Sequence, residues 1–263
     1  MTYEQIKVEK KDHVTIVTIN RPEVMNSVSP VTTVELDKAF NEFSEDPEAW
    51  ICIVTGAGDR AFSAGNDLKF QAQHGNEKMR ELMKGVKGGF AGITARFDCY
   101  KPFIAAVNGL ALGGGFEIAL ACDIIIASEN ASFGLPEPRV GLIPGAGGVH
   151  RLPRQIPYHL AMNMIMTSKR ITPQEAREYG IVAEVVPLAD LLATAEKYAA
   201  EILKGAPLCI RACKEATLKG LKVTLEEAMS TAYPGQVAMY QSEDFIEGPK
   251  AFAEKRPPQW KGR

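Results

Sequence analysis

The chain has 263 residues, of which 46% are hydrophobic and 24% are charged, and its net charge is −2. These values are ordinary for a globular protein of one large domain, or of one domain with an appendage. The near-neutral charge argues against nucleic acid or an anionic membrane as a partner, and no apolar run reaches the ~18 residues that a membrane span needs.

The N-terminus and the cysteines indicate a cytoplasmic protein. Residues 1–6 lack the basic and then apolar pattern of a signal segment. The cysteines are scattered, mostly in apolar contexts, and no cluster of Cys and His has the spacing of a metal site. We therefore expect buried, reduced thiols and no metal. The cysteines are Cys52, Cys99, Cys122, Cys209 and Cys213.

The first quarter of the chain predicts two strands, a helix and a third strand. Residues 6–9 and 14–19 have strand-like patterns, and the second of these alternates apolar residues with Thr. Ser29 and Pro30 are typical of an N-cap and a first helical turn. The apolar run 50–55 indicates a buried strand.

The middle of the chain contains two segments of small and polar residues, each after a strand. The first, 61–69, follows the strand at 50–55. Residues 70–95 are charged and rich in Gln and Gly, so we expect a mobile segment of helix and loop. A buried strand at 103–107 then leads to three glycines, 113–115, and to an apolar helix from about Phe116.

Strand and helix patterns alternate again in the next part, and only helices follow. We expect strands at 122–127 and 181–186 and a helix at 158–166. Residues 172–175 form a capping box, which begins a further helix. From Leu188 onward the pattern is helical only. This order argues for an α/β core with a helical C-terminal appendage.

The two small-residue segments suggest an oxyanion hole. Ligands of α/β folds bind where parallel strands end, and both segments follow buried strands. The backbone N–H groups of Asn66 and Gly114 could therefore hydrogen-bond one oxygen. A helix N-terminus at this place would favour the same negative charge. The alternative is a turn that packs a helix closely against a strand.

Glu117 and Glu137 are candidates for acid–base chemistry. A helix and a returning strand separate them, and this could bring both to one pocket. Paired carboxylates beside an oxyanion hole suit proton transfer between carbon and water. The alternative is that Glu117 interacts with the helix dipole and that Glu137 is a surface residue.

The sequence gives weaker support for a metal site, a nucleophilic serine or a nucleotide-binding loop. His150 and His159 lie outside any metal spacing, and Ser63 and Ser132 lack the pattern of a nucleophile elbow. The glycine runs match neither the dinucleotide-binding fingerprint nor the P-loop.

Three motifs, in this order along the chain, resemble those of the crotonase superfamily, which enoyl-CoA hydratase typifies. They are SAGNDLK at 63–69, NGLALGGGFE at 108–117 and FGLPE at 133–137. GLIPGAGG at 141–148 and AREYGIV at 176–182 also match. The resemblance covers nearly the whole chain.

The resemblance implies a fold, an assembly and a ligand. Residues 1–190 would form a spiral of ββα units with the acyl-CoA site, and residues 191–263 a helical trimerisation region. The assembly would be a homotrimer or a hexamer of two trimers. The substrate would be an acyl-CoA thioester, and no separate cofactor is implied because CoA is part of the substrate.

The resemblance also implies roles for the candidate residues. The N–H groups of Asn66 and Gly114 would hold the thioester oxygen. Glu117 would deprotonate water for attack at the β carbon, and Glu137 would deliver a proton to the α carbon. The implied CoA-binding residues are Ala64 and Lys69 near the site, and Phe252 and Lys255, which would reach the CoA of a neighbouring subunit.

Some positions depart from the plain hydratase pattern. Asn66, Phe116 and Leu135 stand where many hydratases have Ala, Cys and Gln. Phe116, residues 88–94 and the tail from 242 look like the carnitinyl-CoA dehydratase branch, which hydrates crotonobetainyl-CoA. We expect Phe116 to shape the acyl pocket.

The resemblance leaves several functions open. The first is an enoyl-CoA hydratase, and the alternatives in the same fold are a carnitinyl-CoA dehydratase and a Δ3-Δ2 enoyl-CoA isomerase. An isomerase typically manages with one carboxylate, so the pair favours hydration. A non-catalytic member that binds acyl-CoA or RNA is more remote, because both glutamates are present and the net charge is −2.

Overall fold

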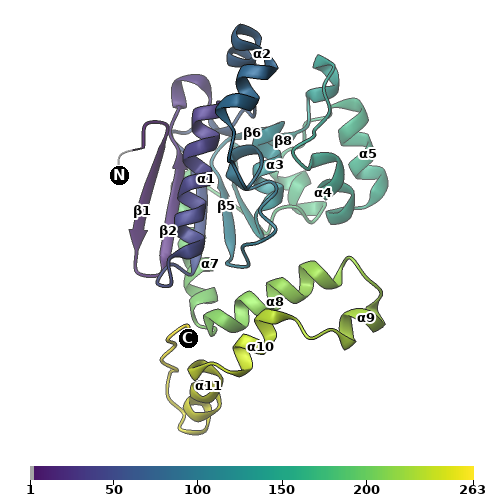
Figure 1. Cartoon of the computed structure of the whole chain (residues 1–263). Helices are drawn as coiled ribbons and strands as arrows, with labels where there is room; N and C mark the ends of the chain where they lie inside the picture. The colour runs from purple at the N-terminus through teal and green to yellow at the C-terminus, as the bar shows by residue number, and fades with distance from the viewer. Residues whose placement is uncertain (1–2) are drawn as a thin grey trace.

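A computed structural model describes residues 3–263, apart from the side chain of Asn76. The larger of its two sheets has the spatial order β1-β2-β3-β5-β7-β9 (Figure 1). β1 and β2 are antiparallel, and the other neighbouring pairs are parallel. The strands are β1 (Ile6–Lys11), β2 (Val14–Ile19), β3 (Ile51–Gly56), β5 (Phe103–Val107), β7 (Ile124–Ser128) and β9 (Glu184–Val186).

The smaller sheet consists of the three strands that are not part of the larger sheet. Its parallel strands are β4 (Ala61–Ser63), β6 (Leu110–Leu112) and β8 (Ser132–Gly134). The chain therefore repeats one pattern three times: a strand in the larger sheet, a strand in the smaller sheet, and a helical segment. This confirms the α/β fold and the crotonase-like spiral that the sequence predicted.

Helices cover both faces of the larger sheet and form the C-terminal end (Figure 1). Those up to the third repeat are α1 (Pro30–Glu45), α2 (Leu68–Leu82), α3 (Gly114–Ala121), α4 (Gly148–Gln155), α5 (Tyr158–Thr167) and α6 (Pro173–Glu178). The later ones are α7 (Leu191–Leu203), α8 (Pro207–Gly220), α9 (Leu225–Ser230), α10 (Pro234–Tyr240) and α11 (Glu243–Ala253). Short 3-10 helices are η1 (Pro22–Val24), η2 (Phe90–Gly92), η3 (Glu137–Val140) and η4 (Leu188–Asp190).

Side-chain alternation along the strands divides the core into two layers. In β3, Cys52 and Val54 point into the cluster that contains α1 and α3, whereas Ile51 and Ile53 point into a second cluster with Ala195 of α7. A parallel strand covered on both faces needs apolar residues on both, which explains its continuous apolar sequence.

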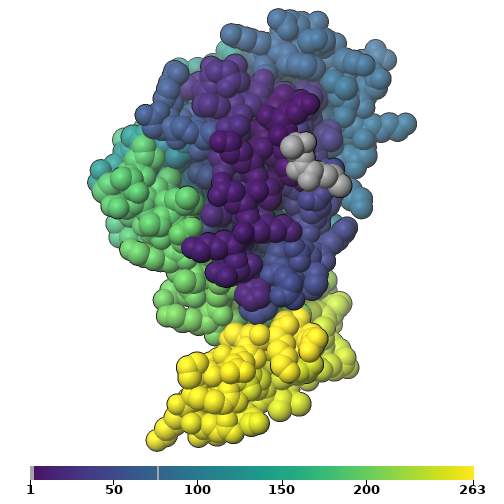
Figure 2. Space-filling view, turned by 90° about the vertical axis from the view of Figure 1, so that its left-hand side faces the viewer, coloured from purple at the N-terminus to yellow at the C-terminus, as the bar shows by residue number. Residues whose placement is uncertain are grey.

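Helices α8–α11 and the residues after them form a C-terminal arm that extends away from the sheets (Figures 1 and 2). Lys214 of α8 holds the arm to the core, because its Nζ donates to Asp123 Oδ2 at 2.6 Å and to Lys101 O at 2.9 Å. Large apolar side chains of the arm are exposed, among them Leu221, Leu225, Met229, Ile246 and Phe252. Within residues 3–263, no helix combines the length and apolar character needed to cross a membrane.

Two local details differ from the predictions. α3 begins at Gly114, two residues before the predicted start near Phe116. Gly115, in its first turn, lies so close to β4 that a Cβ would be 2.0 Å from Ser63 O. Cys213 is exposed, although Cys52, Cys99 and Cys122 are buried as expected. The segment 70–95 contains most of α2 and all of η2.

Candidate active site

Two backbone segments meet beside the ends of β4 and β6. These strands are parallel neighbours, so the chain leaves both at the same edge of the smaller sheet. A Cβ atom on Gly65 would lie 2.7 Å from Leu112 O and 2.8 Å from Gly114 N, and Gly65 has φ of +88°. Only glycine fits there without strain, and this close approach brings Asn66 near Gly114.

The N–H groups of Asn66 and Gly114 are unused within the described part of the chain, because neither donates a hydrogen bond there. Gly114 is the first residue of α3, so the helix itself offers no carbonyl to its N–H. The adjacent amides are occupied, since Gly113 donates to Gly134 O and Asp67 donates to Val28 O. The structure thus brings together two amides that could bind one oxygen.

Glu117 lies in the first turn of α3 with only 3% of its surface exposed. Its Oε1 accepts a hydrogen bond of 2.8 Å from the backbone N–H of Gly148. Burial raises the pKa of Glu117 to about 7, and the negative charge of Glu137 acts in the same direction. The amide of Gly148 and the charge of Arg151 oppose this rise in pKa.

Glu137 begins η3 and reaches the turn before α3. Its Oε1 lies 2.8 Å from the point that a Cβ of Gly113 would occupy, so the carboxyl group packs against bare backbone. Its Oε2 is buried and has no hydrogen-bond partner among the described residues. Burial raises the pKa of Glu137 as well. Glu137 is half-buried as a residue, but its carboxyl group is not at the surface, which argues against the alternative of a surface glutamate.

The two carboxyl groups converge on the N-terminal turn of α3. Their pKa values are both raised, and the charge of Glu137 acts on Glu117. Two neighbouring carboxyl groups with raised pKa values can hold one proton between them, which leaves one as an acid and the other as a base. This is the equipment that addition or removal of water requires.

The amide of Gly148 is a functional group that the sequence analysis did not single out. It belongs to the second glycine run, 141–148, and it begins α4. A glycine run directly before a helix was the available signal, because such a turn exposes backbone N–H groups.

Phe90 of η2 also escaped the sequence analysis. Ring atoms of Phe90 lie 2.5 and 2.7 Å from the point that a Cβ of Gly114 would occupy, so the ring packs on the Cα of Gly114. Phe90 therefore borders the candidate oxyanion hole. Its only signal in the sequence was an aromatic residue within a glycine-rich segment.

A buried ion pair anchors η2 to α1. Arg96 Nη2 donates to Asp37 Oδ1 at 2.8 Å, and the two side chains are 2% and 7% exposed. Asp37 also accepts the N–H of Gly88 at 2.8 Å, and Arg96 Nε donates to Gly92 O at 2.8 Å. The segment that carries Phe90 is thus held at both ends.

The implied CoA-binding residues fall into two groups. Ala64 and Lys69 are exposed beside the candidate site, Lys69 in the first turn of α2. Phe252 is 87% exposed near the end of α11, and Lys255 lies shortly after it. Figure 1 shows α11 well apart from α3, so within one chain these two residues do not reach the site.

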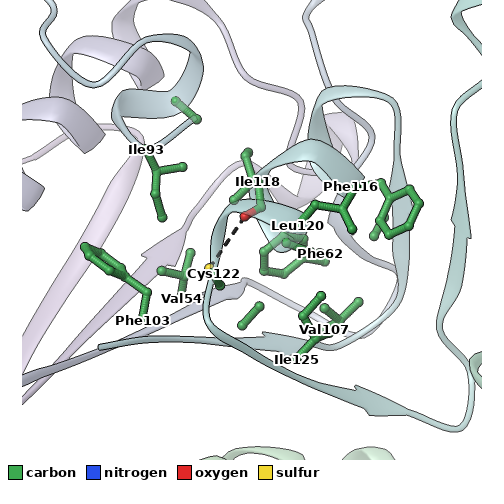
Figure 3. Packing of buried hydrophobic residues seen from close by; sticks show 14 of the residues in the cluster. Val54, Phe62, Ile93, Phe103, Val107, Phe116, Ile118, Leu120, Cys122 and Ile125 are labelled. Carbon is green, nitrogen blue, oxygen red and sulfur yellow. Dashed lines mark hydrogen bonds between the residues drawn. The ribbon is translucent and has the colours of Figure 1, made fainter. Parts of the chain in front are cut away.

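The expectation for Phe116 was wrong. Phe116 is fully buried and packs against Phe133, with ring centroids 5.4 Å apart, so it fills the core and does not line a pocket (Figure 3). Leu135 is fully buried too, but it lies next to the carboxyl group of Glu117. A Cβ on Gly148 would be 3.2 Å from Leu135 Cδ1 and 3.1 Å from Oε1 of Glu117. Leu135 thus contributes to the apolar surroundings of Glu117.

Ser63 holds two backbone segments together and has a structural role. Ser63 Oγ donates to Asn26 O at 2.7 Å and accepts the N–H of Gly65 at 3.1 Å. No group of three or more His, Cys, Asp or Glu residues in the described part of the chain could hold a metal ion.

Comparison with known proteins identifies the family. A sequence profile described as enoyl-CoA hydratase/isomerase matches residues 9–263. The chain therefore belongs to the enoyl-CoA hydratase/isomerase family, which confirms the resemblance to the crotonase superfamily and the expectation of an enzyme of the hydro-lyase type.

Relatives and solved structures match along the full length. Carnitinyl-CoA dehydratases of Salmonella arizonae and Salmonella typhi are 42% identical, over 98% and 99% of this chain and 99% of each relative. The crystal structure of enoyl-CoA hydratase from Bacillus anthracis is 38% identical with a TM-score of 0.92, and the match covers 99% of this chain and 100% of that one. The enoyl-CoA hydratase of Mycobacterium tuberculosis is 36% identical with a TM-score of 0.90, over 98% and 99%.

Proposed function

We propose that this protein is an enoyl-CoA hydratase, which adds water reversibly and in the syn sense to a 2-enoyl-CoA thioester. The convergence of Glu117 and Glu137 on the N-terminal turn of α3 carries the proposal. Both carboxyl groups have raised pKa values, and unpaired amides lie beside them. Family membership supports the same reaction class.

The amides of Asn66 and Gly114 bind the thioester oxygen. As water attacks, negative charge moves onto this oxygen, and two fixed donors stabilise it without reorganisation. The loss of one such donor typically raises the barrier by about 2.7–4 kcal/mol. Backbone donors serve here because Gly65 lets the two segments approach.

Glu117 and Glu137 balance the protons of the addition. Ionised Glu117 removes a proton from water, and the water oxygen forms a bond to the β carbon. The π electrons form the enolate, and its α carbon then takes the proton from Glu137. Glu117 ends protonated and Glu137 ends ionised, and exchange with solvent resets the pair. This balance requires no cofactor other than the CoA of the substrate.

Crotonobetainyl-CoA is a second candidate substrate. The carnitinyl-CoA dehydratases match this chain at 42% identity, above the 38% and 36% of the two enoyl-CoA hydratases with solved structures. The chemistry of Glu117 and Glu137 would be the same for both substrates. The two substrates differ only in the acyl group, so the residues that contact this group decide which of them the protein accepts.

Absorbance of the enoyl thioester tests these proposals. Loss of absorbance with crotonyl-CoA supports the hydratase, and loss with crotonobetainyl-CoA alone supports the dehydratase. A gain of absorbance with a 3-enoyl-CoA, without hydration of either substrate, would identify an isomerase. Tight binding of the CoA esters without any turnover would mean a non-catalytic acyl-CoA-binding protein.

We further propose that the chain works as a homotrimer or a pair of trimers in the cytoplasm. The exposed apolar residues of the C-terminal arm, such as Leu225 and Met229, support burial against other copies. Phe252 and Lys255 would then reach the CoA of a neighbouring copy. The free cysteines fit a reducing compartment. We propose no partnership with nucleic acid or membranes.

Light scattering coupled to size-exclusion chromatography tests the assembly. A mass of three or six chains supports it, and a monomer at micromolar concentration contradicts it. Phe252→Ala should weaken binding of CoA esters without changing the pH dependence of turnover, because Phe252 lies apart from the carboxyl pair.

A further inference from the structure

Arg151 lies one turn inside α4, the helix whose first amide contacts Glu117. Its side chain folds back over the turn before the helix. Nη1 lies 3.5 Å from Ala146 O, and it fills the place of a side chain at Gly147, where a Cβ would be 2.1 Å away. The guanidinium group therefore packs directly on the turn that presents the N–H of Gly148.

The other nitrogen of the guanidinium group contacts the segment that follows η2. Nη2 donates to Thr94 O at 2.8 Å, and the guanidinium carbon lies 5.7 Å from the ring centre of Phe97. Thr94 closely follows Phe90, whose ring packs on Gly114. Arg151 thus joins the turn behind Glu117 to the segment that borders the candidate oxyanion hole.

The charge of Arg151 is held without a carboxylate in direct contact. No ion pair among the described residues includes it, and burial lowers its pKa. Glu117 is one of the groups that stabilise its charge. From the elements around Glu117, the charged groups that act on it are Glu137 of η3 and Arg151 of α4, with opposite effects.

We propose that Arg151 is a positioning residue for the carboxyl pair. Through Ala146 and Thr94 it fixes the amide of Gly148 against Glu117, and its positive charge favours the ionised form of Glu117, which takes a proton from water. The effect on turnover rests on the proposed function. The effect on the ionisation of Glu117 does not depend on it.

A direct titration of Glu117 tests the charge effect. Glutamate side chains labelled with ¹³C are titrated by NMR in a Glu137→Gln background, and the signal of Glu117 is assigned by its loss in Glu117→Gln. We expect Arg151→Gln to move the midpoint upward by about 0.5 pH units or more, less than the roughly 1–3 units typical of an opposite charge in direct contact, because Arg151 forms no ion pair with Glu117 among the described residues. Arg151→Lys should leave the midpoint within about 0.3 units, because it keeps the charge.

Arg154→Gln is the matched control. Arg154 lies on the same helix, and among the described residues its exposed side chain donates only to His150 O, through Nη1. We expect no change in the midpoint or in turnover. An unchanged midpoint in folded Arg151→Gln overturns the charge effect. If Arg151→Gln fails to fold, an upward shift of 0.5 units in Arg151→Lys, which keeps its charge, overturns it instead.

Turnover then tests the positioning. With Glu137 restored, the acid limb of the kcat/KM profile should move to higher pH in Arg151→Gln, whereas Arg151→Lys should lower kcat without moving the limb, because Lys cannot contact Ala146 O and Thr94 O at the same time. A merely structural role would lower kcat and the melting temperature together and leave the limb in place. If the unaltered protein hydrates neither substrate, the proposed function fails, and the titration still decides the charge effect.

Discussion

The backbone N–H of Gly148 meets Oε1 of Glu117 at 2.8 Å and thereby links the first turn of α4 to the first turn of α3. The bond stabilises the ionised form of a carboxyl group that burial otherwise keeps protonated. Because burial and this bond act in opposite directions, both the protonated and the ionised form of Glu117 are accessible near pH 7, as a general base requires. A fully exposed carboxylate would be too weak a base, and an unsupported buried one would stay protonated.

Replacing Glu117 by Gln should abolish most of the activity and leave the fold intact. The amide oxygen of Gln can still accept the N–H of Gly148, so we expect thermal stability to be retained. Hydration should fall by about 10²-fold or more, because no base remains for water. Steady-state hydration of both candidate substrates measures the loss. Glu178→Gln, at an exposed position of α6, serves as the control. A loss of only a few-fold would remove Glu117 from the mechanism.

Glu137→Gln should separate proton delivery from substrate binding. The side chain packs against Gly113 and its Oε2 has no partner in the described residues, so an amide of equal size should fit. We expect kcat to fall by about 10²-fold or more, with CoA-ester affinity changed little. Exchange of the α proton with deuterated solvent should fall in parallel. Undiminished exchange would assign the acid to another group.

The raised pKa of Glu117 predicts a pH-dependent stability. The folded protein holds this proton up to about pH 7, whereas an ordinary glutamate loses it near 4.5. Between these values the folded state binds more protons, so the free energy of unfolding decreases as pH rises. At about 1.4 kcal/mol per pH unit over about 2.5 units, the contribution lost is at most about 3.5 kcal/mol. Stability conferred by this group is complete below pH 4.5.

Urea denaturation from pH 5 to pH 8 measures this dependence. Glu117→Gln should flatten the decrease in the free energy of unfolding, since its side chain does not titrate. Glu178→Gln should follow the unaltered protein. If Glu117→Gln and the unaltered protein lose stability equally with pH, other groups govern the dependence.

Gly65→Ala should damage both stability and activity. The position combines φ of +88° with contacts below 3 Å to Leu112 O and Gly114 N, so a Cβ would push the two segments apart. We expect a loss of about 1–3 kcal/mol and a severe loss of hydration. Gly180→Ala is a matched control, because Gly180 has φ of +84° with open space around it. It should lose part of the stability and none of the activity. Equal behaviour of the two variants would contradict the close approach of Asn66 to Gly114.

The sequence was informative where chemistry depends on local pattern. Glycines after an apolar strand predicted the turn at Gly114, and Glu117 followed from its place in the next helix. Strand alternation and capping residues predicted most elements within a few residues. The short strands β4, β6 and β8 were not predicted individually, because three-residue strands carry little local pattern. The family resemblance implied only a repeated ββα unit, and the division into two sheets came from the structure.

Long-range contacts were beyond the reach of the pattern. The bond from Gly148 to Glu117 spans 31 positions, and that from Arg96 to Asp37 spans 59. Phe116 was misplaced because an aromatic residue beside a catalytic candidate fits a pocket and a core equally well. Its contact with Phe133 of β8 decides between them, and no spacing in the sequence encodes that contact.

The buried pair of Asp37 and Arg96 also restricts how this chain can diverge. Loss of either partner alone leaves a charge in the interior, at a typical cost of about 3–5 kcal/mol, whereas an apolar replacement of both is often tolerated. A single substitution at either position therefore produces a strongly destabilised protein. In descendants of this protein we expect the two positions to change together or not at all, and Phe90 to keep its place wherever the pair is retained.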